Sequence, residues 1–99
     1  MITIRAKINL YNNKERTWSI KTGYRPLFNF ISDSKTSGQI TVLDQQEIEV
    51  GCEAEVLINF ISDSFLGNDF IIGKQFTFDE GGIALGEGEI LEIIMTKLV

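Results

Sequence analysis

The first ten residues alternate between apolar and polar side chains, and no other feature of the sequence restricts the fold as strongly. In an extended segment over residues 2–10, one face would be apolar and the other polar. The apolar positions are Ile2, Ile4, Ala6, Ile8 and Leu10. A period of two is typical of a half-buried strand and argues against a helix.

Further segments rich in β-branched and aromatic residues predict strands over residues 27–31, 39–43, 53–61, 75–78 and 83–98. Good helix formers also fill residues 87–98, but Gly86, Gly88 and Ile93-Ile94 favour a strand. We expect Gly86 and Gly88 to mark a bend or bulge in it. Six or seven short strands without a linker predict an all-β fold, a barrel or a sandwich, as one domain over residues 1–99.

Two further patterns bear on how the strands are arranged. The hexapeptide Asn-Phe-Ile-Ser-Asp-Ser occurs at residues 29–34 and again at 59–64, and each copy is expected to end a strand and open a turn. Residues 1–37 hold seven basic and two acidic residues, a net charge of +5, whereas residues 38–99 hold two basic and twelve acidic residues, a net charge of −10. We expect folding to interleave the two halves, so that the charges neutralise one another across strands.

Residues that commonly carry catalysis are scarce in this chain. It contains no His, and Cys52 is its only Cys, which we expect to be buried. Residues 67–75 have glycines too far apart for a phosphate-binding loop, and Phe70-Ile71-Ile72 is predicted to be a buried segment. The alternating acids Glu47, Glu49, Glu53 and Glu55 fit a solvated strand face. The sequence predicts a protein that is not an enzyme and that uses no cofactor and no metal.

The N-terminal residues do not form a targeting signal, because Arg5 and Lys7 interrupt the apolar stretch. The longest apolar runs are too short to span a bilayer. We therefore expect a cytoplasmic protein with no membrane association.

Three stretches together resemble the C-terminal, third β-barrel domain of translation elongation factor Tu. Gly23 to Phe30 (GYRPLFNF) is similar to that domain's Gly-Tyr-Arg-Pro-Gln-Phe-x-Phe motif, and Phe76 to Gly88 is similar to its closing Phe-x-Ile-Arg-Glu-Gly-Gly-x-Thr-Val-Gly-x-Gly segment. The opening strand fits the family's first strand, and Ser37-Gly38 falls where the family has Thr-Gly. The resemblance runs in order over nearly the whole chain and implies a small antiparallel barrel of six to seven strands, without a GTPase domain.

In the family, this domain contacts the T stem of aminoacyl-tRNA and meets the exchange factor. The resemblance places Arg16, Arg25, Glu80 and Gly81 at RNA-contacting positions. Four other positions depart from the family pattern in ways that disfavour RNA binding: Thr17, Leu27, Ser37 and Asp79. At Asp79 an acid replaces an Arg, so a repelling charge replaces one that attracts phosphate.

An aromatic and arginine-rich patch near residues 16–25 is typical of a protein-interface hot spot. Its aromatic members are Trp18 and Tyr24, flanked by Arg16, Lys21 and Arg25, although Trp18 could instead plug one end of the barrel. The predicted function is therefore a binding module for a protein partner, for example an immunity or antitoxin protein that neutralises its target. The alternative is a translation accessory that binds tRNA or a translation factor, and the predicted partner-binding residues are Arg16, Trp18, Tyr24, Arg25, Glu80 and Gly81.

Overall fold

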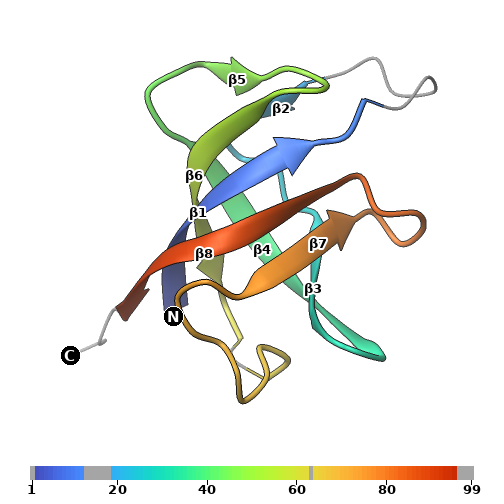
Figure 1. Cartoon of the computed structure of the whole chain (residues 1–99), viewed down its shortest axis with the longest axis vertical. Helices are drawn as coiled ribbons and strands as arrows, with labels where there is room; N and C mark the ends of the chain where they lie inside the picture. The colour runs from blue at the N-terminus through green and yellow to red at the C-terminus, as the bar shows by residue number, and fades with distance from the viewer. Residues whose placement is uncertain (1, 13–18, 63, 96–99) are drawn as a thin grey trace.

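The chain folds into a closed barrel of six antiparallel strands, in the order β1-β6-β4-β3-β7-β8 (Figure 1). The computed structural model describes residues 2–12, 19–62 and 64–95. The barrel strands are β1 (Ile2–Leu10), β3 (Leu27–Ile31), β4 (Ser34–Val42), β6 (Glu53–Phe60), β7 (Gln75–Asp79) and β8 (Gly86–Met95). The prediction of an all-β antiparallel barrel with six to seven strands is confirmed, and the barrel has six.

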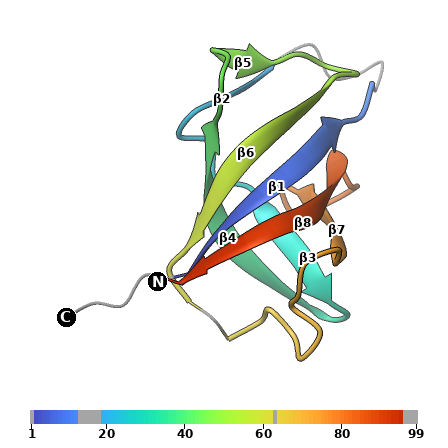
Figure 2. The same ribbon diagram turned by 60° about the vertical axis from the view of Figure 1, so that its left-hand side comes forward.

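Two short strands, β2 (Ile20–Lys21) and β5 (Glu47–Ile48), pair with each other outside the barrel. They lie at one end of the barrel, and the long loop between β6 and β7 lies at the other end, as Figures 1 and 2 both show. None of the described residues forms a helix that is long and apolar enough to cross a membrane.

The barrel closes through β1, which pairs with β6 on one side and with β8 on the other. The alternation predicted for residues 2–10 is confirmed, because Ile4, Ala6, Ile8 and Leu10 are fully buried while Lys7 is exposed. Closure removes the free strand edges that would otherwise invite pairing with other chains.

Phenylalanine rings fill much of the barrel interior. Phe28 and Phe30 on β3 each pack edge-to-face on Phe60 of β6, with ring centroids 5.5 Å apart in both pairs. Phe76 and Phe78 of β7 complete this cluster beside Phe28. The repeated hexapeptide thus contributes Phe30 and Phe60, which contact each other. Its copies contain the last residues of β3 and β6, as predicted, although Asp63 of the second copy lies outside the described residues.

Gly86 and Gly88 are needed for close packing, and the bulge of this strand does not lie at either glycine. A Cβ at Gly88 would lie 2.6 Å from Cζ of Phe76 and 2.8 Å from Cγ2 of Ile8. At Gly86 it would meet the Phe78 ring in the same way. The register shift between β1 and β8 falls between Arg5 and Ala6, which pair with Glu92 and Ile90. The bulge is therefore at Leu91.

Three other predictions differ from the structure. Strand β4 begins at Ser34, five residues before the predicted start, because its inward positions there are Thr36 and Gly38, which conceal the apolar alternation. The last strand begins at Gly86 rather than residue 83, and Ile83 lies exposed in the preceding turn. Cys52 is exposed, since it follows the left-handed turn residue Gly51 just before β6 begins.

The two oppositely charged halves of the sequence interleave in the barrel, as predicted. Arg5 on β1 forms ion pairs with Glu55 of β6 and Glu92 of β8. Lys7 approaches Glu53 at 3.9 Å, and Lys35 pairs with Asp79 at 2.6 Å. Each of these pairs joins a base from residues 1–37 to an acid from residues 38–99.

Candidate functional site

The structure brings together two segments that the sequence singled out separately. Leu27 at the start of β3 pairs with Asp79 at the end of β7, so the Gly23–Phe30 stretch lies beside the β7–β8 turn. The Tyr24 hydroxyl donates a hydrogen bond of 2.6 Å to Oε1 of Glu80, directly joining the two segments. Of the six predicted partner-binding residues, Tyr24, Arg25, Glu80 and Gly81 fall in this region, while Arg16 and Trp18 lie outside the described residues.

Backbone geometry fixes the position of Tyr24. Gly23 adopts φ +104°, and its N–H donates to the carbonyl of Ile40. The Tyr24 carbonyl in turn accepts from the Ile40 N–H. The half-buried Tyr24 ring packs against the core and its hydroxyl reaches Glu80 at the surface. This arrangement presents a largely immobilised aromatic side chain at low entropic cost.

Arg25 is exposed next to Tyr24. Its guanidinium donates to Oε1 of Gln39 on β4 at 3.3 Å, a long hydrogen bond at the surface. The weak tether leaves most of the five guanidinium donors available for a ligand.

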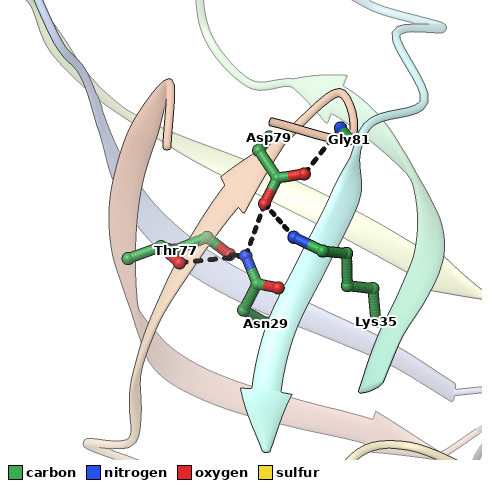
Figure 3. A network of polar contacts seen from close by, with 5 residues as sticks. All are labelled: Asn29, Lys35, Thr77, Asp79 and Gly81. Carbon is green, nitrogen blue, oxygen red and sulfur yellow. Dashed lines mark hydrogen bonds and ion pairs between the residues drawn. The ribbon is translucent and has the colours of Figure 1, made fainter. Parts of the chain in front are cut away.

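Asp79, which precedes Glu80, is the centre of a network of polar side chains from β3, β4 and β7 (Figure 3). Its carboxylate accepts hydrogen bonds from Nζ of Lys35 at 2.6 Å, from Nδ2 of Asn29 at 2.8 Å and from the Gly81 N–H at 2.7 Å. The Asn29 amide also donates to Oγ1 of Thr77 at 3.0 Å. The Gly81 contact fixes the β7–β8 turn, in which Gly81 has φ +100°.

Asp79 remains ionised although its side chain is only 2% exposed. Burial raises the pKa of Asp79, but the hydrogen bonds from Lys35, Asn29 and Gly81 and the charge of Lys35 outweigh burial and leave the pKa below its ordinary value. The sequence interpretation of Asp79 as a charge that repels phosphate needs correction, because its carboxylate is buried and neutralised by Lys35.

The outer face of β6, β1 and β8 carries five glutamates against two cations. A shallow depression of about 250 Å³ opens there, lined by Lys7, Asn9, Glu53, Gln75, Glu87, Gly88 and Glu89. Among the described residues, no three acidic or cysteine side chains lie close enough together to hold a metal ion.

Sequence reasoning missed an apolar surface on the loop between β6 and β7. Phe70-Ile71-Ile72 was predicted to be buried, but only Phe70 packs inward, while Ile71 and Ile72 are 62% and 66% exposed. Gly73 adopts φ +93° directly after them. In a loop, three adjacent apolar residues do not indicate which of them face inward, because side chains in a loop do not alternate sides at a fixed interval as they do in a strand or helix.

The described residues thus form a small closed β-barrel with a tyrosine- and arginine-bearing surface at one end and an apolar loop at the other. A comparison with known protein-family models finds no match for this chain.

Proposed function

We propose that this chain is a non-enzymatic binding module, related to the third domain of elongation factor Tu, whose surface around Tyr24, Arg25 and Glu80 binds a protein partner. The observation that carries the proposal is the Tyr24–Glu80 hydrogen bond of 2.6 Å. It holds an aromatic ring beside a weakly tethered arginine, and this pairing of residue types dominates binding energy in protein interfaces.

The relationship to elongation factor Tu is supported by the positions of the two resembling motifs. They meet through the pairing of Leu27 with Asp79, and each contains a left-handed glycine at its turn, Gly23 and Gly81. The filled interior supports a function at the outer surface, because large side chains such as Phe28, Phe60 and Phe78 occupy the space inside the barrel.

Purification of the tagged protein from its native cells, followed by mass spectrometry, tests the proposal. We expect a stoichiometric protein to accompany the wild-type chain and to be lost with the double variant Tyr24→Ala/Arg25→Ala. Gln75→Ala, an exposed change at the opposite end of β7, is the matched control and should retain the partner. If the double variant retains the partner as well as the control does, this surface is not the binding site.

A second candidate function, association with tRNA, is favoured by the environment of Asp79. Because Lys35 neutralises Asp79, that carboxylate does not oppose the exposed cations Lys21 and Arg25 near this end of the barrel. Filter binding at low salt tests this candidate: affinity for tRNA should fall steeply as salt rises, and further with Arg25→Ala. No binding at low ionic strength excludes it.

A further inference from the structure

The loop between β6 and β7 exposes four large apolar side chains at the end of the barrel opposite Tyr24 and Glu80. We call Ile61, Phe65, Ile71 and Ile72 the loop patch; all four are exposed. The loop occupies the lower end of the molecule in Figures 1 and 2. Ile71 and Ile72 are neighbours in the chain and line one hollow, and exposed apolar residues that lie together mark interaction sites more often than isolated ones do.

The loop patch is not needed to cover the barrel core, because other residues of the same loop pack on the core. Leu66 is 3% exposed, and the Phe70 ring packs edge-to-face on Phe30 at 5.2 Å. Lys74 pairs with Asp69 at 2.5 Å, and the Gly73 N–H donates to the Ile90 carbonyl of β8 at 2.8 Å. These contacts anchor the loop from within and hold the outward residues in a defined arrangement.

The charged side chains of β8, the strand beside the end of the loop, are acidic, and they face Arg5 and Lys7 of β1 on their other side. The Ile90 N–H donates to the Lys74 carbonyl, and Gln75 pairs with Glu89, so the end of the loop lies along β8. On the outer face of β8, Glu87, Glu89 and Glu92 form an acidic stripe. Within the described part of the chain, neither Glu87 nor Glu89 has an ion pair, and the loop's own cation, Lys74, is engaged by Asp69.

We infer that the loop patch and the acidic stripe together bind a basic protein segment, whose apolar side chains cover Ile71 and Ile72 while its Lys or Arg side chains face Glu87 and Glu89. A shallow hollow of about 510 Å³ beside Ile71, Ile72 and Lys74 provides room for an apolar side chain. The net charge of −5 attracts such a segment over longer range.

Charge complementarity favours this occupant over two others. A second copy of the chain in a two-fold dimer would bring the acidic stripes toward each other, because an isologous interface uses the same surface twice. An anionic lipid surface would be repelled by the same glutamates. The inference concerns a surface separate from Tyr24, Arg25 and Glu80, and it stands or falls independently of the proposed function.

The test uses an amphipathic peptide of Lys and Leu as the probe and a Glu and Leu peptide of the same pattern as its control. Titration of the isotope-labelled protein, followed by NMR, should shift amide signals in residues 64–75 and 87–92 with the Lys peptide only. Ile71→Ser/Ile72→Ser should weaken affinity by roughly tenfold or more. Glu87→Gln/Glu89→Gln should weaken it several-fold and reduce its salt dependence, and Tyr24→Ala/Arg25→Ala should leave it unchanged.

Each contrary outcome overturns the inference in a recognisable way. Equal binding of the two peptides, or shifts confined to other surfaces, removes the role of the acidic stripe. Concentration-dependent dimers in sedimentation that Ile71→Ser/Ile72→Ser abolishes would identify a second copy as the occupant. Loop-patch-dependent binding to phosphatidylcholine or phosphatidylserine vesicles would identify a membrane. Unchanged thermal unfolding of the variants ensures that lost binding does not reflect lost folding.

Discussion

A carboxylate that is almost completely shielded from water stays ionised only when its neighbours replace the lost hydration, and Asp79 has three such neighbours. Lys35, Asn29 and Gly81 come from β4, β3 and the β7–β8 turn, so the network ties three parts of the barrel together. Buried acids held in this way link stability to pH.

Replacing Asp79 by Asn should therefore change both stability and its pH dependence. The pKa of Asp79 in the folded state lies below its ordinary value of 3.8, so the ionised carboxylate stabilises the fold above pH 3.8 and this contribution is lost as the pH falls through the folded-state pKa. We expect Asp79→Asn to lower the free energy of unfolding by about 1–3 kcal/mol at neutral pH and to flatten its decline in acid. Urea unfolding followed by circular dichroism at several pH values measures both effects.

Asp69→Asn is the matched control for this experiment. The Asp69 pKa is also lowered, chiefly by the hydrogen bond from Lys74, but this carboxylate is exposed and solvent screens its charge. An acid dependence that Asp69→Asn alters as much as Asp79→Asn would contradict a special role for the buried network.

Gly88 provides the second test at the scale of single residues. An added methyl group would overlap the Phe76 ring and Ile8, both of which are fixed inside the barrel. We expect Gly88→Ala to lower the free energy of unfolding by about 1–3 kcal/mol. Gly82→Ala, where a Cβ meets nothing within 4 Å, should leave stability nearly unchanged in the same denaturation assay. Equal effects of the two changes would show that the Phe76 ring can move aside.

At the scale of whole elements, the strands predicted most accurately are those in which apolar and polar side chains alternate regularly. Strands β1 and β6 alternate regularly and were predicted almost to the residue. The first half of β4 was missed because Thr36 and Gly38 occupy its inward positions. The sequence also could not distinguish inward from outward residues in the β6–β7 loop, and so the loop patch was not foreseen.

The anchoring of that loop predicts a contrast between two of its apolar residues. Leu66→Ala should lower the free energy of unfolding by about 2–3 kcal/mol, since it opens a cavity beneath the loop. Ile71→Ala removes a side chain that is already 62% exposed and should change stability by less than about 0.5 kcal/mol. Thermal unfolding of the two variants compares them directly, and similar losses would mean that Ile71 belongs to the core in solution.

At the scale of the whole molecule, part of the candidate site followed from the sequence and part required the fold. The motifs containing Tyr24, Arg25, Glu80 and Gly81 were identified from the residues, but their meeting depends on β3 pairing with β7 across fifty residues of chain. Neutralisation of Asp79 by Lys35 depends on the same long-range pairing and has no local signature in the sequence.

The closed barrel also predicts how the molecule opens. Strand β1 is paired along both sides, from Ile2 to Asn9 with β6 and from Ile2 to Leu10 with β8. Its amides therefore lose their protection from hydrogen exchange only when the barrel unfolds. The β2–β5 pair has two residue positions, Ile20–Ile48 and Lys21–Glu47, and we expect so short a ladder to separate before the barrel opens.

In native-state hydrogen exchange, we therefore expect the amides of β1 to exchange with the free energy of global unfolding, measured independently by denaturant titration. Amides of β2 and β5 should exchange with a smaller free energy that responds less to added denaturant than that of β1, because local separation exposes less surface than global unfolding. If β2 and β5 instead exchange together with β1, the buried side chains of Ile20 and Ile48 join the small sheet to the cooperative core. The surface at Tyr24 would then unfold together with the barrel and the small sheet, since the Tyr24 N–H donates a hydrogen bond to the carbonyl of Lys21 in β2.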